Sequence, residues 1–179
     1  MDLKTIYKSS YANRGMILED DINITNKYYL DSNIAIIYKK PTPVKITKYS
    51  YNKAKISEAF FETQSTLDYN GLYKGKYIEF DAKETKSKTS FPLSNIHKHQ
   101  LEHIKKIIEH KGIVFLIVKF SLLDKIFVLM GSDLIDFMNT YDRKSIPLAY
   151  FLDRGYLVEL KYSPRLDYIK VIDKILEER

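Results

Sequence analysis

The sequence predicts an α/β fold in which helices flank a mixed β-sheet, and it predicts one domain over residues 1–179. The chain has 179 residues, 45% of them hydrophobic and 29% charged, which is typical of one globular domain. Helical and strand-like patterns alternate along it, and no repeat or clear linker divides it. The longest apolar run, Ile113–Val118, is too short to span a bilayer, and residues 1–15 hold no apolar signal segment. We therefore expect no membrane partner.

The first half of the chain predicts one helix and three strands around an irregular insertion. A partial apolar stripe predicts a helix over 13–30, and a β-branched run predicts a strand over 34–38. Two prolines then interrupt regular structure, and residues 44–64 form a basic segment of undefined shape. Two further strands are expected over 66–73 and 76–85.

The second half predicts a long amphipathic helix followed by strands and short helices. Leu101, Ile104 and Ile108 recur at helical spacing, and Gly112 is a typical helix end, so we expect a helix over 93–111. Serine side chains often cap helix N-termini, and two of them predict the starts of short helices. The other expected elements are strands over 113–120, 126–130 and 156–160, short helices beginning at Ser132 and Ser145, and a helix over 166–178.

Positive charge is concentrated in the segment that follows the first predicted strand. The formal net charge is +6, and no acidic residue lies between Tyr38 and Lys55. Lysines contact phosphates, and tyrosine rings stack on unpaired bases. The same pattern also fits a solvated edge hairpin that lysines protect from aggregation, so both interpretations stand. The candidate DNA-binding residues are Lys39, Lys40, Lys45, Lys48, Lys53 and Lys55.

Several kinds of site are excluded by composition. The absence of cysteine rules out a disulfide framework, a cysteine zinc site, an iron–sulfur cluster and a thiol nucleophile, and it fits a cytoplasmic protein. No glycine-rich phosphate loop and no Gly-x-Ser-x-Gly elbow occurs. His99 and His103 have metal-ligand spacing, but no glutamate completes a His-Glu-x-x-His box. We interpret these histidines as solvated or DNA-facing.

The two strands over 66–73 and 76–85 form the most informative part of the sequence. A two-residue turn at Lys74-Gly75 places Asp68 opposite Asp81 and Thr66 opposite Lys83. Side chains alternate along strands, so one face of this hairpin is apolar and the other carries the acids. A rival turn at Asn70-Gly71 is a stronger hairpin dipeptide, but it leaves the pattern after residue 77 without a partner. The first register is therefore preferred.

Two carboxylates on facing strands need something that offsets their repulsion. At a separation of about 5 Å, they repel by roughly 3 kcal/mol at an effective dielectric constant near 20. A divalent cation offsets this repulsion, and aspartate, hydroxyl and carbonyl oxygens suit Mg²⁺. A solvent-facing hairpin would offset it by screening. The pattern alone leaves both open.

The residues around this hairpin carry a family resemblance. Asp68 followed by Asp81-Ala82-Lys83 matches the PD-(D/E)xK pattern of restriction-endonuclease-like nucleases, which is short and degenerate. Longer motifs are more specific: Asn13-Arg14-Gly15-Met16, Lys39-Lys40-Pro41-Thr42-Pro43-Val44, Ser65-Thr66-Leu67-Asp68-Tyr69-Asn70-Gly71, Lys83-Glu84-Thr85 and Lys88-Thr89-Ser90-Phe91-Pro92-Leu93. With these motifs the chain resembles the bacterial RecU family of Holliday-junction resolvases over about residues 13–173.

The resemblance implies a restriction-endonuclease-like mixed sheet and assigns roles to individual positions. Lys83 falls on the lysine thought to stabilise the transition state, and it would form the catalytic group with Asp68 and Asp81. Position 81 departs from the family, which usually has glutamate there. The positions at which the family binds Mg²⁺ are Thr66, Asp68, Asp81 and Gln100.

The resemblance also implies a function. It is that of a Mg²⁺-dependent, structure-selective endonuclease with one or two Mg²⁺ per subunit, which resolves four-way DNA by paired symmetric nicks during recombination and repair. Residues 44–63 would form a stalk that enters the junction centre. A homodimer, recombinase or branch-migration partners and a cytoplasmic, nucleoid-associated location are expected. The alternatives are a non-catalytic junction-binding protein that modulates a recombinase, and a duplex-specific nuclease on the same core.

Overall fold

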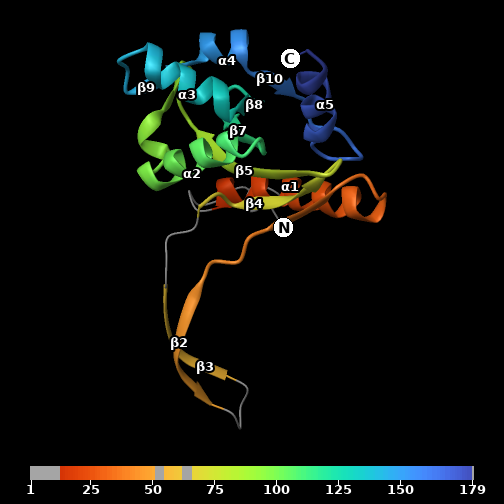
Figure 1. The fold of residues 1–179 in the computed structure, drawn as a ribbon, viewed down its shortest axis with the longest axis vertical. Helices are drawn as coiled ribbons and strands as arrows, with labels where there is room; N and C mark the ends of the chain where they lie inside the picture. Colours follow the sequence, from red (N-terminus) through yellow and green to blue (C-terminus); the bar gives the residue numbers. More distant parts are fainter. Residues whose placement is uncertain (1–12, 51–54, 62–65, 179) are drawn as a thin grey trace, which may run out of the picture.

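The structure is a computed structural model that describes residues 13–50, 55–61 and 66–178, and it has a mixed α/β architecture (Figure 1). A six-stranded sheet has the order β1-β4-β5-β7-β8-β10, in which β5 and β7 are parallel and every other pair is antiparallel. Its strands are β1 (Ile36–Lys39), β4 (Tyr69–Tyr73), β5 (Lys76–Thr85), β7 (Ile113–Phe120), β8 (Lys125–Met130) and β10 (Tyr156–Val158). The predicted fold class is confirmed.

Helices cover both faces of this sheet. The apolar side of α1 and that of α5 share one buried cluster with alternate sheet residues such as Phe80 and Phe115. A second cluster, containing Val114 and Leu116, joins the opposite face to α2 and α3. The helices are α1 (Asn13–Asp31), α2 (Lys98–Glu109), α3 (Gly131–Thr140), α4 (Leu148–Arg154) and α5 (Tyr168–Glu178). In the described segments, no helix is long and apolar enough to cross a membrane.

The β4–β5 hairpin turns where the first of the two registers places it. Tyr73 pairs with Lys76 and Leu72 with Tyr77. Lys74 and Gly75 have φ angles of 47° and 76°, the left-handed values that a tight hairpin turn requires. Gly71 serves a different purpose, because a Cβ atom there would lie 1.9 Å from the carbonyl oxygen of Ile36 on β1.

The structure corrects the start of this hairpin. Its pairing ends at Tyr69 opposite Phe80, so neither Asp68 and Asp81 nor Thr66 and Lys83 form the strand pairs that the sequence predicted. The carbonyl of Asp68 instead accepts a hydrogen bond of 2.7 Å from the backbone N–H of Lys40. Because β4 begins at Tyr69, strand alternation does not extend to the residues before it. Leu67 accordingly lies in the cluster under α2, on the face opposite to Tyr69.

Helix boundaries in the second half also differ from the predictions. The region 93–111 is divided into a 3₁₀ turn, η3 (Leu93–Asn95), and α2, with His97 as the N-cap of α2. Neither serine is a helix N-cap. Ser132 lies inside α3, whose N-cap is Met130, and Ser145 begins a short strand. That strand, β9 (Ser145–Pro147), pairs with β6 (Ser90–Pro92) and leads into α4 through Pro147. Pro147 is the N-cap of α4 and makes no side-chain cap hydrogen bond.

The basic segment forms a hairpin that projects from the body of the molecule (Figure 1). Its strands are β2 (Val44–Ser50) and β3 (Lys55–Phe61), which pair antiparallel with irregularities around Lys48. The apolar side chains of Val44, Ile46 and Phe60 are exposed on it. We call this element the stalk hairpin. Lys53 lies outside the described residues.

Candidate active site

Strand β5 carries two carboxylates to the underside of α2. Ile78 and Phe80 face the core beneath α1 and α5, so Glu79 and Asp81 point to the other face. A hairpin that was only a solvated edge would leave that face exposed. Instead, α2 covers it, and the side chains of Glu79 and Asp81 are both 0% exposed.

Asp81 is held by two donors on one of its oxygens. The amide Nε2 of Gln100 donates to Oδ2 at 2.7 Å, and Lys83 Nζ lies 2.8 Å from the same oxygen. The second oxygen, Oδ1, is buried and has no hydrogen-bond partner among the described residues. A buried carboxylate oxygen without a partner is costly. Asp21 Oδ2 and Glu84 Oε2 are also buried without partners, but at Asp81 the carboxyl of Asp68 is adjacent, and a bound cation would stabilise that pair.

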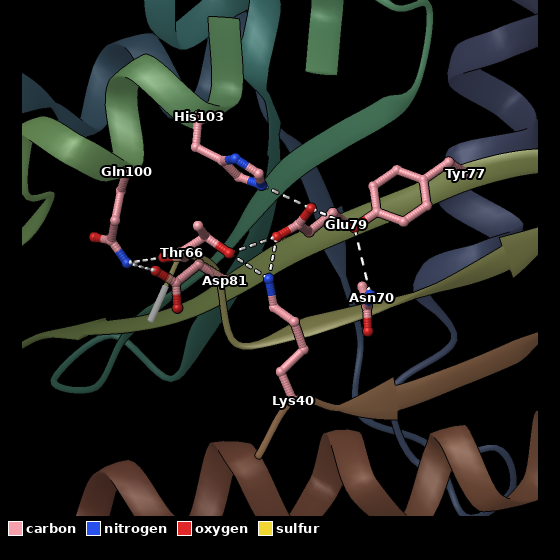
Figure 2. A network of polar contacts seen from close by, with 8 residues as sticks. All are labelled: Lys40, Thr66, Asn70, Tyr77, Glu79, Asp81, Gln100 and His103. Carbon is pink, nitrogen blue, oxygen red and sulfur yellow. Dashed lines mark hydrogen bonds and ion pairs between the residues drawn. The ribbon is translucent and has the colours of Figure 1, made fainter. Parts of the chain in front are cut away.

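Gln100 is fixed by three contacts. Its Oε1 accepts a hydrogen bond of 3.1 Å from the backbone N–H of His97, which satisfies one of the unpaired donors at the start of α2. Its Nε2 donates both to Asp81 and to the carbonyl of Thr66 at 2.8 Å. The side chain therefore joins the helix, the strand and the segment before β4, as Figure 2 shows. Ligation of a cation through Oε1 would require rotation of this amide.

Asp68 completes the pair of facing carboxylates. Burial, followed by the neighbouring carboxyl of Asp81, raises the pKa of Asp68 to about 7, while the charges of Lys83 and Lys39 oppose that rise. The raised pKa of Asp68 reflects first the cost of burying its charge and second the proximity of another carboxylate. A divalent cation between the two carboxylates would offset both effects.

These residues fit a hard divalent cation. Asp68 and Asp81 supply carboxylate oxygens, the hard ligands that suit Mg²⁺. The expected ligands Gln100 and Thr66 lie beside them, but Gln100 directs Nε2 at Asp81, and Thr66 Oγ1 is bound by Lys40 and Glu79. Among the residues that the structure describes, no group of three or more His, Cys, Asp or Glu side chains is arranged to hold a metal ion. The donor set thus depends on a pair of carboxylates rather than on histidine or cysteine ligands.

Glu79 is the centre of a second network that the sequence interpretation did not find (Figure 2). Its Oε1 is bound by Lys40 Nζ and lies 3.1 Å from Thr66 Oγ1, while Tyr77 Oη donates to Oε2 at 2.6 Å. His103 Nε2, from α2, lies 2.9 Å from Oε2. Burial alone would raise the pKa of Glu79, but hydrogen bonds from its donors, Lys40 first, outweigh it and leave the pKa below its usual value. Glu79 is therefore an ionised buried carboxylate.

Two signals were available for Glu79 in the sequence, and neither was sufficient. It lies two residues before Asp81 and hence on the same strand face, and His103 lies one helical turn after Gln100. Which distant element covers that face is decided by packing. His103, interpreted as solvated or DNA-facing, in fact contacts the buried carboxylate.

The candidate DNA-binding lysines have different environments. Lys40 Nζ is bound by Thr66 and Glu79, and its side chain is only 20% exposed. Lys39 pairs with Glu19 on α1, and Lys48 lies 2.8 Å from Glu58 on the stalk hairpin. Lys45 and Lys55 are exposed on the stalk hairpin. Lys40 thus belongs to the interior network, because its ammonium group is taken up by protein partners.

The fold and the site define the class of this protein. A mixed sheet whose hairpin brings Asp68, Asp81 and Lys83 together under a helix is the arrangement of an α/β nuclease of the restriction-endonuclease-like type. A family model described as RecU, Recombination protein U, matches residues 13–174. The chain belongs to the RecU family.

Individual relatives match nearly the whole chain. Proteins named Holliday junction resolvase RecU from Bacillus cereus (strain AH820), Bacillus anthracis (strain A0248) and Bacillus thuringiensis (strain Al Hakam) are similar to it. Each is 51% identical over 176 residues, which cover 95% of this chain and 88% of the relative. The expected family membership is confirmed.

Proposed function

We propose that this protein is a Mg²⁺-dependent endonuclease that resolves four-way DNA junctions by paired nicks. The observation that carries the proposal is the buried Oδ1 of Asp81, which has no hydrogen-bond partner in the described part of the chain and lies near the carboxyl of Asp68. Membership of the RecU family and relatives named Holliday junction resolvase support the choice of substrate.

Asp68 and Asp81 would hold the cation. Gln100 and Thr66 would be further ligands only after rotation of the Gln100 amide and release of Thr66 Oγ1 from Lys40 and Glu79. When bound, Mg²⁺ lowers the pKa of a coordinated water and neutralises charge that develops on the scissile phosphate. Gln100 orients Asp81 by donating to Oδ2, which leaves Oδ1 directed at the site. Lys83, 2.8 Å from Asp81, is placed to stabilise negative charge on the phosphate in the transition state. The products would be a 5′-phosphate and a 3′-hydroxyl.

The stalk hairpin is the proposed source of junction selectivity. It projects from the body and presents lysines together with exposed apolar side chains, which suits a junction centre where phosphates converge and bases can unstack. We further propose one nuclease domain with the stalk as an insertion at 44–63, and a homodimer that offers two sites to a two-fold substrate. Recombinase or branch-migration proteins as partners and a cytoplasmic, nucleoid-associated location belong to the same proposal.

One experiment tests the proposal against its alternatives. The protein is incubated with an immobile synthetic four-way junction or with linear duplex of the same sequence, each with Mg²⁺ or with EDTA. We expect symmetric nicks in the junction with Mg²⁺ only, and little cleavage of the duplex. Binding of the junction without cleavage would instead identify a non-catalytic junction-binding protein. Equal cleavage of the two substrates would identify a duplex nuclease.

A further inference from the structure

We propose that Glu79 is a positioning residue that fastens both ends of the stalk hairpin to the cutting site and thereby sets which phosphodiester is cut. Glu79, Lys40 and Thr66 form this contact, which we call the clasp. The inference rests on the proposed function, because it concerns the register between a junction-reading element and the carboxylates that would hold the cation.

The clasp joins the two segments from which the stalk hairpin emerges. Lys40 follows β1 and precedes β2, and Thr66 lies between β3 and β4. Lys40 Nζ binds both Thr66 Oγ1 and Glu79 Oε1, and Thr66 Oγ1 also lies 3.1 Å from Glu79 Oε1. The backbone N–H of Lys40 adds a hydrogen bond of 2.7 Å to the carbonyl of Asp68. One buried carboxylate thus holds the incoming and the outgoing chain at the same point.

The clasp is also continuous with the site. The carbonyl of Thr66 accepts from Gln100 Nε2 at 2.8 Å, and the same nitrogen donates to Asp81 at 2.7 Å. A displacement of Thr66 therefore displaces the donor that orients Asp81. Pro41 and Pro43 stand between Lys40 and the first strand of the stalk hairpin, and fixed proline φ angles reduce the slack in that connection. Figure 2 shows Glu79 between Lys40 on one side and the α2 residues on the other.

Glu79 itself is anchored independently of the stalk hairpin. Tyr77 Oη, on the same strand, donates to Oε2 at 2.6 Å, and His103 Nε2 from α2 lies 2.9 Å from it. One oxygen is thus attached to the body and the other to the ends of the stalk hairpin. This division is the reason to assign Glu79 a positioning role. A carboxylate that served packing alone would not need to stand where the two chain segments meet.

The test compares Glu79→Gln, Lys40→Met and the double variant in the full-length protein on an immobile junction with Mg²⁺. Cut positions are mapped at nucleotide resolution, junction affinity is measured with Ca²⁺ in place of Mg²⁺, and unfolding temperature is recorded. For each single variant, we expect a single-turnover rate lower by about 100-fold, because small misplacements of reacting groups have effects of that size. We also expect the cuts to be spread over neighbouring phosphodiesters. The junction affinity should stay within about threefold of the wild-type value, because Lys40 and Glu79 bind each other and not the DNA.

The double variant separates positioning from stability. It leaves neither an unpaired ammonium nor an unpaired carboxylate, so its unfolding temperature should return toward that of the wild type. If the clasp positions the stalk hairpin, the cuts made by the double variant remain spread over neighbouring phosphodiesters although its stability has recovered. If Glu79 only supports the fold, cut positions remain those of the wild type in every variant, and the rate recovers together with the unfolding temperature, which overturns the inference.

Matched controls use the exposed ion pair of α5, in which Lys174 Nζ lies 3.7 Å from Glu178. Lys174→Met and Glu178→Gln make the same chemical changes away from the site, and neither should move the cuts or the rate. Should the wild type itself fail to nick the junction, the proposed function falls and this inference falls with it. If the wild type cuts at one position, and the Glu79→Gln and double variants cut at that same position, the inference is contradicted while the proposed function stands.

Discussion

Two carboxylates at alternate positions of β5 have the same burial but different surroundings. Both oxygens of Glu79 have donors, from Lys40 and Thr66 on one side and from Tyr77 and His103 on the other. Within the described segments, Asp81 has donors on Oδ2 but none on Oδ1. Since a buried carboxylate oxygen needs a partner, Glu79 is complete as it stands, whereas Asp81 requires something further. This difference supports the proposed roles, in which Glu79 positions neighbouring segments and Asp81 binds the cation.

Asp81→Asn should abolish cleavage, because the amide replaces one of the two charges that hold the cation. Junction binding without metal should persist or tighten, since a negative charge that faces phosphate is removed. Asp81→Glu is the matched control: it restores the residue that the family usually has, and cleavage should persist. Single-turnover cleavage and junction affinity are measured for both. An Asp81→Asn protein that nicks junctions at the wild-type rate would rule out Asp81 as a cation ligand.

Lys83→Ala should lower the rate of cleavage without weakening junction binding. Removal of a preorganised donor that meets negative charge only in the transition state lowers the rate of cleavage by about 100-fold or more. Because ground-state binding is unchanged by its removal, kcat falls while KM stays near its wild-type value. The readout is the kcat and KM pair on the synthetic junction. Intact turnover with weakened binding would make Lys83 a phosphate contact instead.

Strand β5 organises the molecule at the scale of its elements. Its pairing with β4 fixes the register of the hairpin, and its parallel pairing with β7 places its acidic face under α2. The edge strand β1 approaches β4 so closely at Gly71 that any side chain there would meet backbone atoms of Ile36 and Ile37. The segment that leaves β1 carries Lys40, so this close approach also positions one end of the stalk hairpin.

Gly71→Ala should destabilise the protein, since the new Cβ would lie 1.9 Å from the Ile36 carbonyl oxygen and the strands would have to separate. Overpacking of this kind costs about 1–3 kcal/mol, which thermal unfolding can measure. Gly75→Asn is the control. Gly75 has a φ of 76° and nothing within 4 Å of a built Cβ, and asparagine tolerates left-handed backbone. Equal destabilisation by the two variants would mean that the close approach to β1 is not the cause.

Replacing residues 45–63 with a short Gly/Ser loop should preserve the fold and Mg²⁺ binding but reduce junction affinity sharply. The clasp residues lie outside the replaced segment, so the site keeps its support. The dependence of log affinity on log salt concentration should flatten by about 0.9 for each phosphate that the shortened protein no longer neutralises. Affinity for duplex should change less, because the remaining cations are retained. Salt titrations of both substrates measure this, and an unchanged preference for junctions would show that another surface reads them.

At the scale of the whole molecule, the sheet separates two cores with different consequences. The cluster beneath α1 and α5 is formed by apolar and aromatic side chains, with Phe80 stacked between Tyr69 and Phe115. The opposite face shares its interior with the buried carboxylates, so the packing of α2 and the geometry of the site depend on each other. We therefore expect the stability of the fold and the proposed cation binding to be linked.

Saturating Mg²⁺ should raise the unfolding temperature, because the folded chain brings Asp68 and Asp81 together and the unfolded chain does not. At a concentration of 100 times Kd, such linkage adds about 2.7 kcal/mol to the free energy of unfolding. KCl at equal ionic strength is the control for general screening, and Asp81→Asn should abolish the effect. If KCl reproduces the whole shift, no specific cation site is formed by these residues.

Local patterns were sufficient for α1, the strands of the six-stranded sheet, the turn at Lys74-Gly75 and the pairing of β4 with β5, but not for the stalk hairpin or the small β6–β9 sheet. Period-two and helical spacings arise from neighbours along the chain, so the sequence carries them directly. The sequence also placed Asp68, Asp81, Lys83 and Gln100 as one group, through the register and the family motif. It misplaced Thr66 as a strand partner of Lys83, because nothing local marks the residue at which pairing begins.

Tertiary structure alone decided what covers the acidic face of the hairpin. The sequence determined that Glu79 and Asp81 share a face, but α2 arrives on that face from residues far along the chain and turns it from a solvated edge into an interior. The same packing gave Lys40 and His103 internal partners, although both resemble surface residues in the sequence. The physical reason is that burial, and with it the need for every charge to find a partner, depends on contacts between distant elements.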